Sequence, residues 1–414
     1  MRACWHIAVM LLLGMLAGGC AKDRACCESG CYTPPTVLDC QPVERRPLLA
    51  DLSLLANRPQ PPGPHAYCNL TEHDAQCRAA LHAPNARLLE LEADAIAAQA
   101  GGHHRSADAS TTERALRLQA IHERNRNASA AAQLLLRIAA AENGADSLRR
   151  QLTEAEQTLA DLKRLQIAGL PQPLSVPQTE AQRYEVEHKL GEVELTIDQL
   201  NSQLAMLLGG ELPPGSRFWP DVNLQVDPAV PPLEEVQSLA VAQRADLAAL
   251  RVGTSSGGSA TAARALLGQT AGLGLSLSSC QLLSLLHFRA AADEAATRSD
   301  QLHSSLADKQ QSVRNEVAQA ILQIDARLNQ IATSRQRVDS LRQHQENLQR
   351  SAADMANASF EIRRARLAVL AAEQDVFSDV IEWKVAAVKL REAEGALAVE
   401  CGYTDALFVT GCYP

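Results

Sequence analysis

The stretch LLLRIAAAENGADSLRRQLTEAEQTLADL, from Leu134 to Leu162, decides the fold of this chain. Its apolar residues recur in alternating steps of four and three: Leu134, Ile138, Ala141, Ala145, Leu148, Leu152, Ala155, Leu159 and Leu162. A repeat of 3.5 residues keeps one narrow apolar seam on one side of a helix. The stretch therefore predicts a long helix that packs along a partner helix with a left-handed supercoil.

A second seam follows after a turn and supplies that partner. Its members, again in steps of four and three, are Val186, Leu190, Val193, Ile197, Leu200, Leu204 and Leu207. Between the two seams lies Gly169-Leu170-Pro171-Gln172-Pro173, whose two prolines end any helix. After Leu208, Gly209-Gly210 is a helix C-cap signal. The sequence from about Thr112 to Leu208 thus predicts a helical hairpin.

The same design occurs again from about Phe288 to Leu397. The outgoing arm carries Val317, Ile321, Ile324, Leu328, Ile331, a polar Arg335, Val338 and Leu341, and the return arm carries Leu367, Leu370, Phe377, Ile381 and Val388. The predicted fold class is mainly α: two tandem long α-helical coiled-coil hairpins from an internal duplication, with short flanking helices and at most a vestigial β segment. An ordinary soluble helical bundle is the alternative that the pattern alone leaves open.

Composition shifts divide the rest of the chain. We expect a signal peptide over 1–19, a Cys/Pro-rich leader that is mostly irregular over 20–84, and a first hairpin repeat over 85–210. A Pro-rich, extended linker over 211–232, a second repeat over 233–400 that opens with a short helix from Leu233 to Arg251, and a tail over 401–414 complete the division. The one strand pattern is the alternation GLGLSLS, from Gly272 to Ser278.

The N-terminus carries a secretion address. Arg2 precedes an apolar run from Ile7 to Leu16, which is too short to span a membrane and is typical of a signal peptide. The small residues before Cys20 resemble a bacterial lipobox, which implies that Cys20 is lipidated and anchors the chain to a membrane surface. Ala21 rather than Asp follows Cys20, which favours outer-membrane sorting. Cleavage of a plain signal near Ala17 or Gly19 is the alternative.

Eleven cysteines are many for a helical protein, and in an oxidising compartment they favour disulfides. Local spacing makes Cys68–Cys77 and Cys401–Cys412 the candidate pairs. The N-terminal cysteines lack paired CxxC spacing, so we expect no metal site and no cofactor. No nucleophile accompanies the charged residues of the helix arms, so we expect no enzyme. A net charge of −9 without a basic stripe argues against nucleic acid as a partner.

Four segments in order resemble the TolC-like outer membrane efflux protein family. LAVAQRADLAALR, from Leu239 to Arg251, is similar to a family hallmark, with Arg244, Asp246 and Leu247 in place and Ala245 where proline is usual. The other three segments are NSQLAMLLGGELPPG (201–215), GLGLSLS (272–278) and VRNEVAQAILQIDARLNQI (313–331), which resemble the end of the first return helix, a strand and the second long helix. The strand segments are shorter here than in the family.

The resemblance implies a passive conduit for efflux or secretion. Such a protein is a homotrimer whose tube of hairpins meets a periplasmic adaptor and an inner-membrane pump. The resemblance also places adaptor contacts at the hairpin tips. These are Gly169, Leu170 and Pro171 at one tip and Phe360, Arg363 and Arg364 at the other. The expected location is the periplasmic side of the outer membrane. The reduced strands leave an alternative, a barrel-less periplasmic helical lipoprotein that acts as a scaffold or spacer.

Overall fold

The computed structural model describes residues 36–38, 43, 65–99, 107–172, 174–255, 288–352 and 358–404. The chain forms two units. Residues 1–37 form the first, in which strand β1 (Thr36–Val37) is described, and residues 38–414 form the second. The predicted signal peptide, Cys20, the strand pattern at 272–278 and Cys412 lie outside the described residues.

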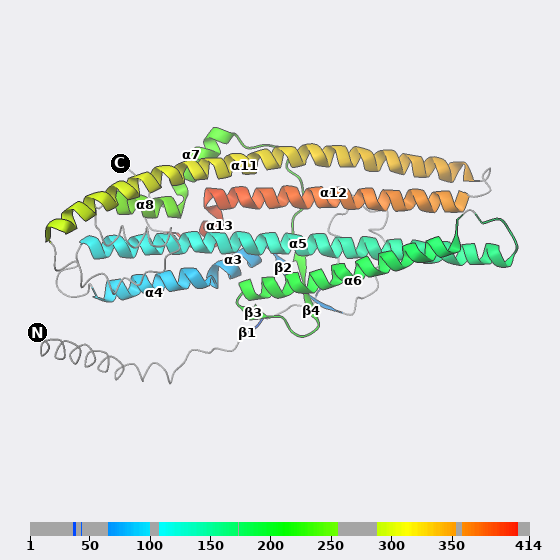
Figure 1. Ribbon diagram of the computed structural model, residues 1–414, viewed down its shortest axis with the longest axis horizontal. Helices are drawn as coiled ribbons and strands as arrows, with labels where there is room; N and C mark the ends of the chain where they lie inside the picture. Colours follow the sequence, from blue (N-terminus) through cyan, green and yellow to red (C-terminus); the bar gives the residue numbers. More distant parts are fainter. Residues whose placement is uncertain are drawn as a thin grey trace, which may run out of the picture. The chain divides into compact units, whose positions relative to one another are not determined.

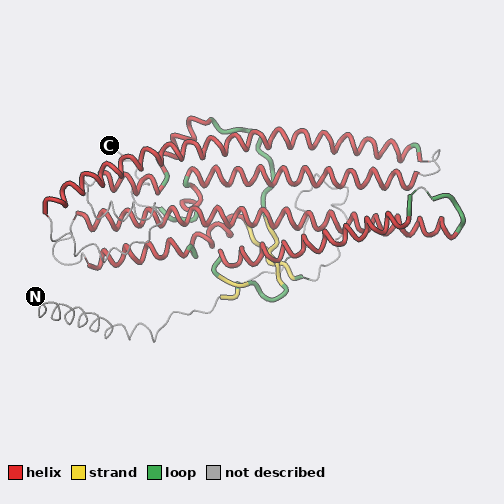
Figure 2. Tube along the Cα trace, in the orientation of Figure 1, coloured by secondary structure: helices red, strands yellow, loops and turns green. Residues whose placement is uncertain are grey.

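Helices dominate the second unit (Figure 2). Its elements are β2 (Ala66–Thr71), α3 (Glu72–Leu81), α4 (Pro84–Gln99), α5 (Ala107–Ile167), α6 (Val176–Leu207), β3 (Gly210–Glu211), β4 (Ser216–Asp221), α7 (Leu233–Gln243), α8 (Ala245–Ser255), α11 (Phe288–Arg350), α12 (Ala358–Glu394) and α13 (Ala396–Glu400). The predicted mainly-α class is confirmed. None of the helices within the described ranges is long and apolar enough to cross a membrane.

Two long hairpins form the body of this unit, α5 with α6 and α11 with α12 (Figure 1). The seam of α6 is confirmed, because every residue predicted for it is buried or half-buried while most of its neighbours are exposed. The seam of α11 is confirmed in the same way, and the polar Arg335 within it faces solvent. Gly209 ends α6 with φ of +74°, the left-handed conformation that a C-cap glycine provides.

Helix α5 is more enclosed than a two-helix seam predicts. It contacts α3, α4, α6, α8 and α12 (Figure 1). Its faces outside the seam are therefore also covered, and Leu135, Leu136 and Ala139 are fully buried. A strict coiled-coil seam describes the tip half of this helix, whereas the other half lies in the middle of a bundle.

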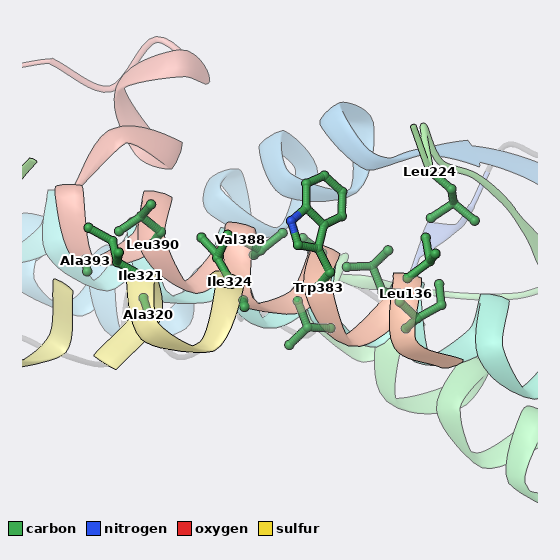
Figure 3. Packing of buried hydrophobic residues seen from close by; sticks show 14 of the residues in the cluster. Leu136, Leu224, Ala320, Ile321, Ile324, Trp383, Val388, Leu390 and Ala393 are labelled. Atoms are coloured by element: carbon green, nitrogen blue, oxygen red, sulfur yellow. The ribbon is translucent and has the colours of Figure 1, made fainter. Parts of the chain in front are cut away.

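The largest apolar cluster lies where α11, α12 and α5 meet (Figure 3). Ile321 and Ile324 of α11 and Val388 and Leu390 of α12 approach one another there, and the Trp383 ring packs in the same row. Leu136 belongs to this cluster although it comes from the first hairpin. The core thus joins the two copies of the duplication to each other, since removing apolar surface from water is the main favourable contribution to folding.

Part of the predicted irregular leader is regular structure, which corrects the expectation for 20–84. Strand β2 pairs in parallel with β4, from Ala66 opposite Ser216 to Thr71 opposite Asp221. The Thr71 side chain then accepts a hydrogen bond of 3.1 Å from the Asp74 backbone N–H and caps α3. The predicted extended linker therefore contains a strand, whose partner lies 150 residues earlier in the chain.

The single short helix predicted from Leu233 to Arg251 is two helices, which is a second correction. Helix α7 ends at Gln243 and α8 begins at Ala245, because Arg244 between them has φ of −65° and ψ of 126°. This extended conformation is the one that a residue before proline adopts. The backbone therefore has the shape that the proline usual in the family motif would impose, although Ala245 occupies that position.

We predict that Ala245→Pro raises the free energy of unfolding by about 0.4–1 kcal/mol, since it restricts the unfolded chain without disturbing the first position of α8. The matched control is Ala248→Pro one turn later, where the backbone N–H donates to the Arg244 carbonyl oxygen at 3.0 Å. Losing that bond should cost about 3 kcal/mol. Denaturant unfolding followed by circular dichroism measures both, and a large destabilisation by Ala245→Pro would contradict the prediction.

Candidate functional site

The first candidate site is the tip between α5 and α6. Helix α5 ends when the Leu170 N–H donates to the Leu165 carbonyl oxygen at 3.0 Å and Gly169 takes φ of +68°. An added Cβ at Gly169 would meet nothing within 4 Å, so its left-handed backbone is what requires glycine there. The predicted tip residues Gly169, Leu170 and Pro171 are all exposed.

This tip exposes apolar side chains to solvent. Ile167 is 88% exposed, Leu170 54% and Leu174 47%. Single exposed apolar residues are common on protein surfaces, but three within eight residues at one tip are a candidate contact surface for a partner. The arrangement fits helix-on-helix docking, in which an apolar surface of a second protein excludes water from such side chains.

The second tip differs from expectation. Phe360 is half-buried and Arg364 is exposed in the first turns of α12, as an accessible tip requires. Arg363 instead forms an ion pair with Asp161 of α5 within the chain. The nearby Arg366 Nη1 lies 2.7 Å from Glu154 Oε1, also on α5. Two arginines near this tip, Arg363 and Arg366, are thus paired with acidic residues of the first hairpin.

These ion pairs belong to a ladder of polar contacts between α5 and α12. Asn143 Nδ2 donates to Gln374 Oε1 at 2.7 Å, and Asn125 Nδ2 donates to the Glu392 carbonyl oxygen at 2.9 Å. Residue numbers rise along α5 as they fall along α12, so the two helices are antiparallel. Both hairpins therefore turn at the same end of the unit (Figure 1).

The motif residues Arg244 and Asp246 form a buried polar junction at the start of α8, away from the tips. Arg244 donates to Asp246 from Nε at 3.0 Å and from Nη2 at 2.7 Å, a bidentate pair with both side chains 5% exposed. Arg244 also pairs with Glu316 of α11, and Lys309 Nζ lies 3.3 Å from Asp246 Oδ2. Leu247, the third motif residue, is fully buried.

The junction holds α5, α8, α11 and the end of α12 together. His122 of α5 places Nδ1 3.8 Å from Asp246 Oδ2. Gly395, between α12 and α13, has φ of +79°, and an added Cβ would lie 3.4 Å from both Cα and Cγ of Arg244. The left-handed backbone therefore favours glycine here, and a Cβ would only just fit beside Arg244.

The junction favours the charged form of Asp246 and the neutral form of His122. Burial opposes ionisation of Asp246, but hydrogen bonds from Arg244 and the positive charges of Arg244 and Lys309 outweigh it and lower the pKa of that carboxyl well below its usual range. Burial lowers the pKa of His122, and Arg244 and Lys309 lower it further against the opposing charge of Asp246. The folded protein therefore favours neutral His122 beside a charged Asp246.

The disulfide pairs predicted from local spacing are wrong. Cys77 of α3 is bonded to Cys401 at the end of α13, with 5.0 Å between their Cα atoms. Cys68 is also in a disulfide, and its partner is therefore not Cys77. Sequence spacing misled because α3 and α13 meet across the bundle. No three His, Cys, Asp or Glu side chains gather as metal ligands in the parts of the chain that the structure describes.

Three solved structures share this arrangement. The CmeC outer membrane channel of Campylobacter jejuni matches with a TM-score of 0.61 and 12% identity, over 81% of this chain and 90% of that one. The VceC outer membrane protein of Vibrio cholerae gives 0.56 and 15%, over 78% and 96%. CusC, described for its transmembrane channel formation, gives 0.53 and 17%, over 79% and 96%. No protein-family model and no curated protein matches the sequence.

The chain has the fold of TolC-like outer-membrane channels. The structural match spans nearly the full length of each channel and about four-fifths of this chain. Within this TolC-like fold, the motif residues Arg244 and Asp246 pair with each other at the junction, and the motif residue Leu247 is buried in the apolar cluster. The predicted tip residues separate into exposed ones, such as Leu170 and Arg364, and Arg363, which is paired internally.

Sequence reasoning missed the partners of the junction. Glu316 and Lys309 lie seven residues apart on α11, which places them on one side of that helix, yet nothing in a single sequence joins them to Arg244. His122 gave no signal either, because it lies on α5 among other polar residues. The bidentate Arg–Asp spacing of two residues was the one local clue.

We predict that the fold loses stability as pH falls from about 7.5 through 6.5, because unfolded His122 binds a proton there and the folded junction resists it. His122→Gln should flatten this part of the profile, and Asp246, whose pKa is lowered, should keep its contribution until more acidic pH. Unfolding temperatures across this range measure the effect. His188→Gln, at a largely exposed site on α6, is the matched control, and an equal flattening there would contradict the assignment.

Proposed function

We propose that this chain is the passive conduit of a tripartite export system and works as an outer-membrane-factor-like homotrimer. The observation that carries the proposal is the structural similarity to outer membrane channels over about four-fifths of this chain. Long helices with narrow seams suit the wall of a tube, and the polar junctions fix how the helices sit side by side. The proposed role involves no enzymatic step, because the tube supplies a path and energy comes from a partner.

The outer faces of the hairpins support assembly of several copies. Tyr184, Leu195 and Met206 follow one another along α6 and are exposed, with Met206 at 79%. Leu322 on α11 is also exposed. Copies of the chain packed side by side would cover these side chains, and burying each large apolar side chain contributes about 1.5–3 kcal/mol.

The two tips are the proposed contacts for a periplasmic adaptor that connects to an inner-membrane pump. Ile167, Leu170 and Leu174 offer the apolar part of this surface, and Arg364 adds an exposed charge. Gly169 and Pro171 give the turn its shape. Phe360 lies half-buried at the edge of the second tip. Specificity for a transported compound belongs to the pump in this proposal.

We predict stable channel conductance when detergent-solubilised protein is reconstituted into planar bilayers. Leu195→Glu should remove it, because a charge in the exposed stripe of α6 prevents copies from packing, while the helical circular dichroism spectrum stays the same. Leu239→Glu, at an exposed site on α7, is the matched control. Intact trimers that never conduct would contradict the conduit and support the scaffold instead, and cross-linking that yields only monomers would contradict both.

We predict that Cys20→Ala shifts the protein from the membrane fraction to the soluble periplasmic fraction, since the proposed anchor is a lipid on Cys20 at the periplasmic side of the outer membrane. Two or more acyl chains hold a protein stably at a bilayer surface, and their loss removes that affinity. Fractionation with immunoblotting measures the shift. Cys4→Ala, within the predicted signal peptide, is the matched control. Unchanged partition of Cys20→Ala would reject lipidation.

A further inference from the structure

The Cys77–Cys401 disulfide joins two segments that are far apart in the sequence. Cys77 lies in α3, which comes before both hairpins, and Cys401 directly follows α13, which comes after both. The two cysteines are 324 residues apart in sequence. Both are half-buried, so the bond lies near the surface rather than within the core.

The C-terminal segment that carries Cys401 packs on the bundle through Leu397 and Ala398 of α13, which are fully buried. The turn at Gly395 directs α13 back onto α5, where Asn125 Oδ1 accepts a hydrogen bond of 3.3 Å from the Ala398 N–H. The guanidinium of Arg124 lies 4.2 Å from the centre of the Tyr403 ring. The disulfide adds a covalent link between this segment and α3 to these non-covalent contacts.

One of the two sulfurs has a hydrogen-bonding neighbour. His73 lies one turn before Cys77 on α3, and its ring nitrogens Nε2 and Nδ1 are 3.6 and 3.8 Å from Cys77 Sγ. The His73 side chain is otherwise exposed. An imidazole N–H beside a sulfur stabilises its thiolate form, so Cys77 is the better leaving group when the bond is broken.

We propose that Cys77–Cys401 is a thiol–disulfide exchange site for a dithiol oxidoreductase. The thiolate of the oxidoreductase attacks Cys401 Sγ, the bond between the two sulfurs breaks, and Cys77 departs as a thiolate held by the His73 N–H. The oxidoreductase is then bonded to Cys401. The second cysteine of the oxidoreductase then attacks the sulfur of its first cysteine in the mixed disulfide, and Cys401 is released as a thiolate that takes up a proton. Two electrons and two protons pass from the dithiol to the protein, and the reverse sequence forms the bond.

The position of Cys68 gives such an exchange a use during folding. Cys68 lies nine residues before Cys77, whereas Cys401 lies 324 residues after it. A Cys68–Cys77 bond would close a short loop, which costs less chain entropy than closing a long one. Both of these cysteines are also synthesised long before Cys401. In the folded protein Cys68 is bonded to another partner. Any chain in which Cys68 and Cys77 pair first reaches the native Cys77–Cys401 bond only by disulfide exchange. The proposed thiol–disulfide exchange does not depend on whether the chain works as an export conduit.

The attacked sulfur can be identified directly in the full-length protein. The folded, oxidised chain is incubated with a thioredoxin-type oxidoreductase whose resolving cysteine is replaced by serine, and the mixed disulfide is mapped by peptide mass spectrometry. We expect the adduct on Cys401. An adduct on Cys77, no adduct at either cysteine, or the absence of the Cys77–Cys401 bond in the isolated protein would each overturn the proposal.

The role of His73 has its own test. His73→Ala should slow reduction of this disulfide by a dithiol about threefold or more, since the departing thiolate loses its hydrogen bond. Alkylation of the freed thiols over time, read by mass spectrometry, gives the rate. His188→Ala is the matched control on an exposed helix position. An equal unfolding temperature of the oxidised variants separates rate from stability, and an unchanged rate in His73→Ala would overturn the assignment of the leaving sulfur.

Discussion

The packing of α5 against α12 is the contact on which the rest of the structure depends. Each hairpin alone buries one seam and leaves the other side of its helices open. The contact between the two copies closes the core, because Leu136 of the first hairpin joins the cluster of Phe377 and Val380 in the second. Helices α3, α4 and α8 then pack on the remaining faces of α5. A helix that packs against so many others must keep its position for any of them to pack.

The α5–α12 contact combines apolar packing with polar pairs along its length. Its polar pairs include Asn125–Glu392, Asn143–Gln374, Glu154–Arg366 and Asp161–Arg363. Partly exposed ion pairs contribute only about 0–1 kcal/mol each, so the apolar packing supplies most of the attraction. The polar pairs contribute register instead, since a shift by one turn would leave these groups facing the wrong partners.

Local periodicity predicted the parts of the fold that repeat. The hairpins, their tips, the seam of α6 and the C-cap at Gly209 follow from the spacing of apolar residues and from glycine and proline. Contacts between distant segments left no such trace. The pairing of β2 with β4, the partners of Arg244 and the bond between Cys77 and Cys401 depend on how the helices meet in space. The break between α7 and α8 at Arg244 could be inferred only from the proline that is usual in the family motif, because Ala245 gives no local signal of a helix end.

The disulfide between α3 and α13 also determines how the unit responds to mechanical force. A pull on the chain beyond Tyr403 reaches Cys401 first and passes through a covalent bond into α3. The hydrogen bonds of α13 and its contacts with α5 are thereby bypassed. Tension between the strand–helix segment before the hairpins and the end of the chain never acts across the long helices, which remain mechanically shielded while that one bond is intact.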